Sequence, residues 1–183
     1  MAPIAVIDTE TNWHDQVMSI GCCLADSGSF SCLESRYYVL TPEFRVGGMF
    51  SHTLFPEELP QPRICTRGEA LRELSAWLRQ QGVSCLYAYN AGFDRSHLPE
   101  LSGFEWRDIL RVAAYRQHNP KIPATADCCS TGRLRRGYGV EPMLQLLTGN
   151  RGYRESHNAL LDAMDELEIM RRLGCPACRY PTV

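Results

Sequence analysis

The chain has 183 residues, of which 44% are hydrophobic and 22% are charged, and its formal net charge at pH 7 is −2. These values are typical of one globular domain and exclude a disordered or fibrous protein, and the slightly negative charge argues against long, tight binding to duplex nucleic acid. No apolar stretch approaches the roughly 20 residues that a membrane span needs, and no basic-then-apolar signal opens the chain, so we expect a cytoplasmic protein without a membrane partner.

The first part of the chain predicts three strands. Residues 4–7 form an uninterrupted apolar run that ends at Asp8, as in a buried central strand. Residues 17–24 and 32–40 are two further strand candidates, joined by a turn-rich linker that is short enough for an antiparallel hairpin. The Pro- and Gly-rich stretch 41–67 follows, and we expect it to be an ordered surface loop of a length that often carries function.

The middle of the chain alternates between helix and strand patterns. Apolar residues recur at helical spacing over 70–78, and Gly82 closes this helix. Residues 83–87 follow as a short buried strand and 93–101 as a helix. The apolar segment 109–115 fits either a strand or a helix.

The last part of the chain is expected to end in a helix. Residues 120–139 are irregular, and a helix from about 157 to 173 follows, with Ser156 as its N-cap and Gly174 just after its end. Three strands followed by alternating helices and strands predict an α/β domain with a mixed sheet that helices cover on both faces.

The nine cysteines do not have the pattern of a disulfide framework, because their number is odd and two pairs are adjacent. Cys175 and Cys178 have the spacing of half a zinc site, but no second pair of Cys or His residues follows them. We expect reduced cysteines, and metal binding by this pair is left open.

The first of three acidic segments is Asp8-Thr9-Glu10. Its two carboxylates lie two residues apart at the end of an apolar strand, so both can project towards one side. Carboxylate oxygens are the hard ligands that Mg²⁺ and Mn²⁺ prefer. For so short a pattern, the alternative is a polar strand end without a function.

The second acidic segment runs from Asn90 to Asp94. It follows the strand at 83–87 and opens the next helix, and crevices outside strand ends are where α/β sheets commonly bind ligands. Alternatively, Asp94 only complements the dipole of that helix.

The third acidic segment places His157 at the start of the final helix and Asp162 about one and a half turns further along. A lone histidine at a helix start is usually a surface residue. Asp162, however, lies between Leu161 and Ala163 in an apolar stretch, and a buried acid needs a partner, which a metal ion supplies.

Together and in this order, the three segments resemble the DEDDh exonuclease family, which includes polymerase proofreading subunits. Residues 8–10 match the family's D-x-E motif, 90–94 its N-A-x-F-D type of motif, and 157–162 its H-x4-D motif. A sister group has tyrosine four residues before the last aspartate, where this chain has Asn158. The resemblance spans residues 4 to about 173.

The resemblance implies a ribonuclease H-like fold with a mixed five-stranded sheet and helices on both faces. The exonuclease domain would be residues 1–175, followed by a short C-terminal tail, 176–183. The implied activity is hydrolysis of a terminal phosphodiester, with two divalent cations, Mg²⁺ or Mn²⁺, clamping the attacking and leaving oxygens.

The resemblance also implies a role for each acid. Asp8 would bridge the two ions, Glu10 and Asp162 would complete one site, and Asp94 would act mainly through water at the other. His157 would accept a proton from the attacking water as general base, a task suited to an imidazole.

The implied substrates are the 3′ ends of single-stranded DNA or RNA, from which 5′-mononucleotides are released; the sequence leaves the choice of sugar open. Trp13, Tyr89 and Phe93 are candidates to stack on terminal bases, although core packing is the favoured alternative for Phe93. The other expected substrate contacts are Thr9, Thr11 and Asn90.

The remaining expectations concern partners and alternatives. Arginines at 133, 135, 136, 151 and 154 either contact a short strand or form a solvated loop. A homodimer or a polymerase-type partner is compatible with the family. Two other functions are weighed: a catalytically silent domain that binds nucleic acid or protein, and a simple phosphohydrolase for nucleotides.

Overall fold

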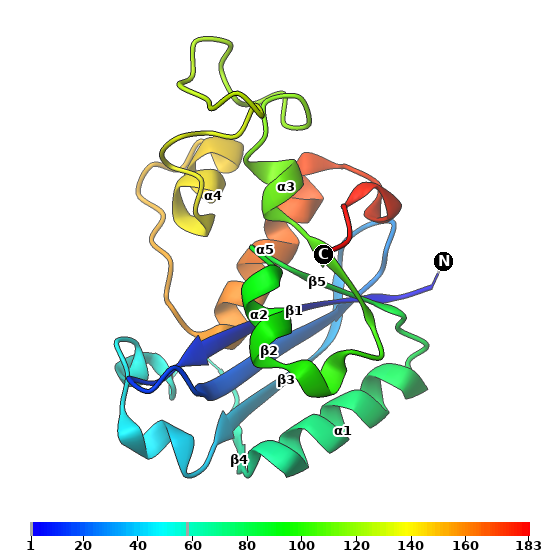
Figure 1. Cartoon of the computed structure of the whole chain (residues 1–183), viewed down its shortest axis with the longest axis vertical. Helices are drawn as coiled ribbons and strands as arrows, with labels where there is room; N and C mark the ends of the chain where they lie inside the picture. Colours follow the sequence, from blue (N-terminus) through cyan, green and yellow to red (C-terminus); the bar gives the residue numbers. More distant parts are fainter. Residues whose placement is uncertain (1, 58) are drawn as a thin grey trace.

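Three antiparallel strands form the first half of the sheet (Figure 1). β1 (Ile4–Thr11), β2 (Val17–Ala25) and β3 (Cys32–Leu40) pair in chain order, which confirms the predicted meander. The computed structural model of the chain describes residues 2–57 and 59–183. Every residue of β2 is buried, because this strand contributes side chains to a hydrophobic core on each face of the sheet.

Three parallel pairings complete the sheet. β5 (Cys85–Ala88) lies parallel to β1, β6 (Glu105–Asp108) parallel to β5, and β4 (Arg63–Cys65) parallel to β3. Over the described residues the strand order is β4-β3-β2-β1-β5-β6, six strands rather than the predicted five. The additional strand is β4, which lies inside the stretch 41–67 that was expected to be a loop. With three residues, β4 is too short to show the two-residue period of a strand.

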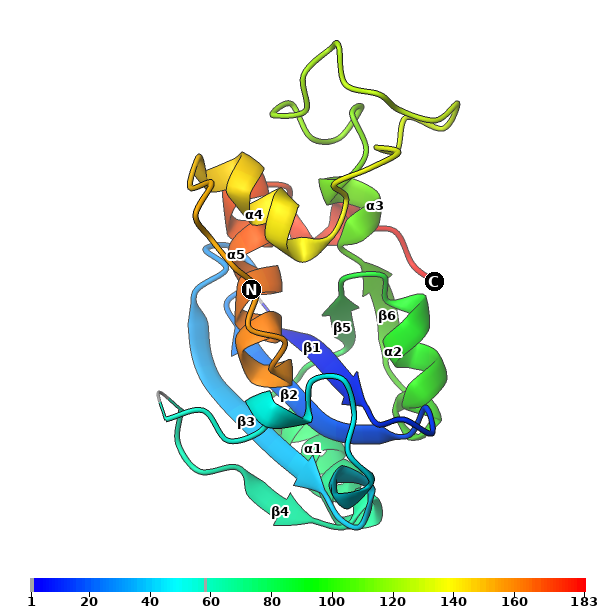
Figure 2. The ribbon, with the colours of Figure 1, turned by 90° about the vertical axis from the view of Figure 1, so that its left-hand side faces the viewer.

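The described part of the chain forms five α-helices: α1 (Arg67–Gln80), α2 (Gly92–His97), α3 (Leu110–Ala113), α4 (Val140–Thr148) and α5 (Ala159–Leu173). The segment 109–115 is therefore helical for the most part, and the strand lies just before it in β6. α4 has no counterpart among the predicted elements. Residues 120–139 are irregular, as predicted, and form the long excursion beyond α3 and α4 in Figures 1 and 2.

Helices cover both faces of the sheet (Figure 2). Alternate residues of β1 divide between the two cores: Ile4 and Val6 pack with α4 and α5, whereas Ala5 and Ile7 pack with α1. This alternation decides where the polar residues at the end of β1 point. None of the helices in the described residues is long and apolar enough to cross a lipid bilayer.

Asn158, not Ser156, caps the last helix. Its side-chain oxygen accepts hydrogen bonds from the backbone N–H groups of Leu160 and Leu161, and its amide donates to Tyr37 Oη at 2.8 Å. The predicted N-cap was wrong because α5 begins at Ala159, three residues after Ser156, whose hydroxyl donates to Asp162 Oδ1 instead. α5 ends before Gly174, which is left-handed with φ +62°, as predicted.

The backbone of α5 rests directly on β2. Gly21, which pairs with Asp8 across β1 and β2, faces the first residue of the helix. A Cβ atom at Gly21 would lie 2.2 Å from the backbone carbonyl of Ala159, so only glycine fits at this contact. The contact holds the beginning of α5, with His157 and Asp162, beside the end of β1.

The C-terminal residues 176–183 fold back against β6. The guanidinium of Arg107 donates hydrogen bonds to the carbonyls of Cys178 and Tyr180 at 2.8 and 2.9 Å, and the backbone N–H of Val183 donates to Trp106. Tyr180 is buried in the core beneath α5.

Candidate functional site

Asp8 and Glu10 lie on the α5 face of the sheet, near the end of β1. They continue the even-numbered series of Ile4 and Val6, which packs on that face. Oδ2 of Asp8 is buried and has no hydrogen-bond partner among the described residues. Burial raises the pKa of Asp8 well above its usual range, and the nearby charge of Asp94 raises it further.

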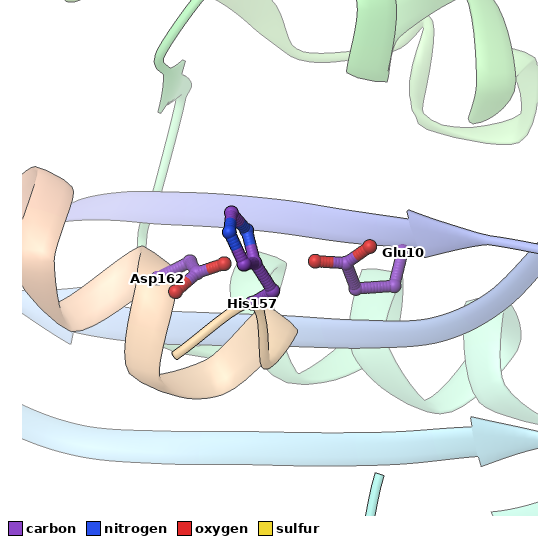
Figure 3. A group of neighbouring side chains, drawn as sticks. All are labelled: Glu10, His157 and Asp162. Carbon is purple, nitrogen blue, oxygen red and sulfur yellow. The ribbon is translucent and has the colours of Figure 1, made fainter. Parts of the chain in front are cut away.

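Glu10, His157 and Asp162 converge in the way that a metal site requires. One ligand atom from each side chain lies within 4.8 Å of the others, and Figure 3 shows the two carboxylates pointing towards each other beside the imidazole. Burial raises the pKa of Glu10 to about 8, with the charge of Asp162 as the next cause. Burial likewise raises the pKa of Asp162 to about 8. Ser156 donates a hydrogen bond to Asp162 Oδ1 at 3.3 Å.

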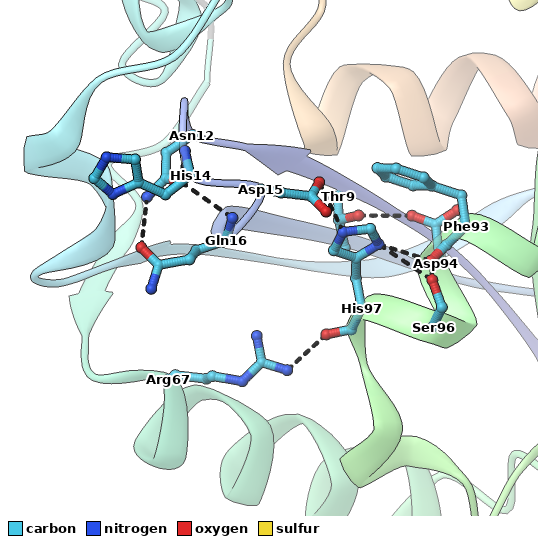
Figure 4. Close-up of polar contacts among 10 residues, drawn as sticks. All are labelled: Thr9, Asn12, His14, Asp15, Gln16, Arg67, Phe93, Asp94, Ser96 and His97. Atoms are coloured by element: carbon cyan, nitrogen blue, oxygen red, sulfur yellow. Dashed lines mark hydrogen bonds and ion pairs between the residues drawn. The ribbon is translucent and has the colours of Figure 1, made fainter.

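Asp94 reaches the same region from the first turn of α2. Only 2% of its surface is exposed, and its Oδ1 accepts a hydrogen bond from the hydroxyl of Thr9 at 2.8 Å (Figure 4). Burial raises the pKa of Asp94 to about 7. The Thr9 hydroxyl thus orients Asp94, and Thr9, a predicted substrate contact, also lines a hollow beside Glu10.

His157 lies two residues before α5 and is held from three directions. Its backbone is left-handed, with φ +54°, and the hydroxyl of Thr53 donates a hydrogen bond to its carbonyl. The ring of Phe50 stacks on the imidazole, with ring centroids 4.0 Å apart and planes 18° apart. Burial lowers the pKa of His157, which favours the neutral imidazole that a general base needs.

A hollow of about 320 Å³ borders the carboxylates. Four of the predicted substrate contacts line it: Thr9, Thr11, Trp13, which is 65% exposed, and Phe93. Met49 and Phe50, from the stretch 41–67, also line the hollow, and neither was singled out in the sequence. Asn90 and Tyr89 do not line it.

Hydrogen bonds connect the turn after β1, which carries Trp13, to α2, which carries Phe93 (Figure 4). These two aromatic residues of the hollow are therefore held in place relative to each other. Nε2 of His97 lies 3.1 Å from Asp15 Oδ1, and its Nδ1 lies 3.0 Å from the carbonyl of Phe93. Arg67 donates to the carbonyl of His97 at 2.6 Å. The backbone of Asn90 is left-handed, with φ +65°, and its N–H donates a hydrogen bond to Asp108 Oδ1 at 3.2 Å.

Two acids of the site were missed in the sequence. Glu166 lies one helical turn after Asp162 and is 1% exposed, and its charge raises the pKa of Asp8. Glu155 is half-buried, and its charge raises the pKa values of both Glu10 and Asp162. The spacing of Asp162 and Glu166 on one helix face was the signal that could have identified the second acid.

No ion pair in the described residues compensates the charge of the cluster, although the nearby charge of His97 lowers the pKa of Asp94 in part. In the part of the chain that the structure describes, no Lys, Arg or His forms an ion pair with Asp8, Glu10, Asp94, Asp162 or Glu166. Buried carboxylates need such a partner, and divalent cations with oxygen ligands fit this donor set. The residues present therefore suit Mg²⁺ or Mn²⁺.

The metal-free protein is expected to lose stability as pH rises. The folded chain holds Glu10, Asp94 and Asp162 at pKa values of about 8, 7 and 8, above the value of about 4 that carboxyl groups have in unfolded chains. Their contribution to stability is complete below about pH 4 and is lost as the pH rises through the folded pKa values. In a chelator, the melting temperature should fall by several degrees between about pH 5.5 and about pH 8.5. An unchanged or rising melting temperature would contradict the burial of these acids.

No protein-family model and no curated protein matches this chain. Its neighbours among solved structures are DEDDh 3′-exonucleases. The nuclease domain of 3′hExo, a DEDDh family member, bound to rAMP, has a TM-score of 0.68 at 16% identity, covering 100% of this chain and 96% of the other. Exonuclease X in complex with 5′ overhanging duplex DNA has a TM-score of 0.56 at 17% identity, covering 97% and 96%. E. coli Exonuclease I in complex with a dA16 oligonucleotide has a TM-score of 0.66 at 12% identity, covering 98% of this chain and 42% of the other.

These likenesses show the fold. The chain has the ribonuclease H-like α/β fold of DEDDh exonucleases over its whole length, with a mixed sheet and helices on both faces, as predicted. The sheet has six strands in the described residues, where five were expected.

Proposed function

We propose that this chain, with the fold of the DEDDh exonucleases, is a metal-dependent 3′-to-5′ exonuclease that acts on the 3′ ends of single-stranded DNA or RNA and releases 5′-mononucleotides. One observation carries the proposal: four carboxylates and a histidine from three distant segments lie close together, and none of these carboxylates forms an ion pair in the described residues. A fold by itself supports no activity, and this cluster supplies the chemistry.

In this proposal Asp8, Glu10, Asp94 and Asp162 hold two Mg²⁺ or Mn²⁺ ions. When bound, the ions neutralise charge on the phosphate and activate the attacking water. The side chains are pre-positioned for this task, because Thr9 orients Asp94 and Ser156 donates to Asp162. Like charges that are held together in a buried site bind a dication more strongly than isolated surface acids do.

His157 accepts the proton of the attacking water. Burial keeps its imidazole neutral, and the stacked ring of Phe50 fixes the plane of the imidazole beside Glu10 and Asp162. A base held in one orientation loses little entropy when the reaction occurs.

The hollow beside Glu10 receives the terminal base. Trp13 and Phe93 expose their aromatic rings there, and a base stacked on such a ring gains about 1 to 3 kcal/mol. Stacking requires an unpaired base, which is why single-stranded ends are the proposed substrate.

The experiment is to incubate the purified protein with 5′-labelled single-stranded DNA and RNA, with Mg²⁺, Mn²⁺ or EDTA, and to resolve the products by length. We expect a ladder that shortens from the 3′ end with either metal and uncut strands in EDTA, and the two substrates report the sugar preference. Uncut strands in every condition would favour a silent binding domain. Turnover of mononucleotides without cleavage of oligonucleotides would favour a nucleotide phosphohydrolase.

A further inference from the structure

Glu166 is a buried acid on a helix face that is otherwise mainly apolar. It lies on α5 one turn after Asp162, and its neighbours on that face, Ala163, Leu167 and Met170, belong to the hydrophobic core. Its exposed fraction is 1%. An ionised carboxylate at such a position destabilises the fold unless a partner compensates its charge.

One oxygen of the Glu166 carboxylate is buried without a hydrogen-bond partner among the described residues. The backbone N–H of Tyr89, which follows β5, lies close enough to favour the ionised carboxylate, and Asp94 in the first turn of α2 lies close enough for its charge to raise the pKa of Glu166. Its Oε2 is inaccessible to water and has no hydrogen-bond partner among the described residues. The side chain therefore presents a buried oxygen without a partner.

The acids around Glu166 supply no compensation. Asp8, Asp94 and Asp162 are all close enough for their charges to act on Glu166 or to respond to it. Asp8 also has a bare buried oxygen, Oδ2, so two acids of the same cluster each present an unpartnered oxygen. A hard dication is the ligand that satisfies such oxygens.

We propose that Glu166 is a fifth carboxylate of the cation site, which uses its free Oε2 to bind Mg²⁺ or Mn²⁺, or a water of the ion, on the side of Asp8 and Asp94. The proposal rests on the metal site of the proposed function and adds a residue that the three sequence motifs do not contain. In the alternative, Glu166 has only a structural part as acceptor for Tyr89, which a neutral side chain of the same shape also fulfils.

The test is Glu166→Gln, which keeps the shape and the acceptor for Tyr89 but removes the charge. Mn²⁺ binding is measured by titration calorimetry, and thermal unfolding is followed in EDTA and in Mn²⁺ at about pH 8, well above the pKa of about 4 that carboxyl groups have in unfolded chains. We expect Mn²⁺ affinity to fall about tenfold or more. We also expect the metal-free variant to melt higher than the wild type, because Gln does not carry the stability cost of a buried carboxyl whose pKa is raised well above its usual value.

Two further variants sharpen the test. Glu168→Gln changes a glutamate of the same helix that pairs with Arg171 at 2.6 Å on the exposed side, and it should leave Mn²⁺ affinity unchanged. Glu166→Asp keeps the charge but shortens the side chain, so the metal-free protein should gain no stability while Mn²⁺ affinity still falls.

The outcomes separate this inference from the proposed function. A wild-type protein that binds no Mn²⁺ would overturn the metal site as a whole. Wild-type binding with the same affinity in Glu166→Gln, or a metal-free Glu166→Gln that melts lower than the wild type, would overturn the part assigned to Glu166 and leave the four other carboxylates in place.

Discussion

Asp8→Asn should abolish nuclease activity while making the metal-free protein more stable. Asn keeps the shape of the side chain but loses the charge that holds the cations, and charge stabilisation by such ions contributes several kcal/mol to the transition state. Since about 1.4 kcal/mol corresponds to tenfold in rate, kcat should fall by about 10³-fold or more. Stability should rise because Asp8 has a buried oxygen without a partner and lies beside other acids.

The two readouts of Asp8→Asn are measured separately, kcat on a labelled oligonucleotide with Mn²⁺ and the melting temperature in EDTA. The control is Asp127→Asn, an aspartate of the irregular segment that pairs with Arg135 and is largely exposed, for which both values should stay at those of the wild type. Lost activity together with a lower metal-free melting temperature would show that Asp8 stabilises the fold, and the assignment as a ligand would fail.

His157→Gln should slow hydrolysis without removing the metal. General base catalysis contributes about 10² to 10⁴-fold, so kcat should fall within that range while KM and Mn²⁺ affinity change little. The carboxylates that hold the ions remain, and glutamine fills the space beside Phe50 without offering a base. Steady-state kinetics on oligonucleotides and calorimetry with Mn²⁺ measure the two effects.

His118→Gln is the matched control for His157→Gln, because His118 is exposed in the irregular segment after α3. It should have wild-type kcat. If His157→Gln lost Mn²⁺ binding as well as activity, His157 would be a metal ligand, a reading that its place in the Glu10 and Asp162 cluster also permits. If it kept full activity, the site would use another base.

The parts of the fold that the sequence predicted well have long or strongly marked patterns. The apolar run before Asp8, the helical spacing of α1 and the glycine after α5 each have a local physical cause. Short elements carry no such mark: β4 has three residues, and only two residues of β6, Trp106 and Asp108, are buried. Their positions are determined by pairing with distant strands.

The candidate site divides in the same way. Its motif residues could be read in sequence because their type and spacing carry chemistry. The residues that hold the motif residues in place could not be identified in the sequence. Phe50 contacts His157 only because the loop that carries it folds over the site. The choice of Asn158 over Ser156 as N-cap depends on the hydrogen bonds that Asn158 donates to Tyr37 and Thr53. Glu166 lies between these cases, since its spacing was visible but its burial was not.

The contact of Gly21 with Ala159 limits how this protein can change during evolution. The two backbones are in direct contact there, next to Asp8. No side chain separates β2 from α5 at this point, so no substitution of such a side chain could change the distance between them. The spacing of the acids is consequently a fixed property of the scaffold. Adaptation to a new substrate would instead involve exposed residues on the rim of the hollow, such as Trp13 and Met49, which do not hold His157 as Phe50 does.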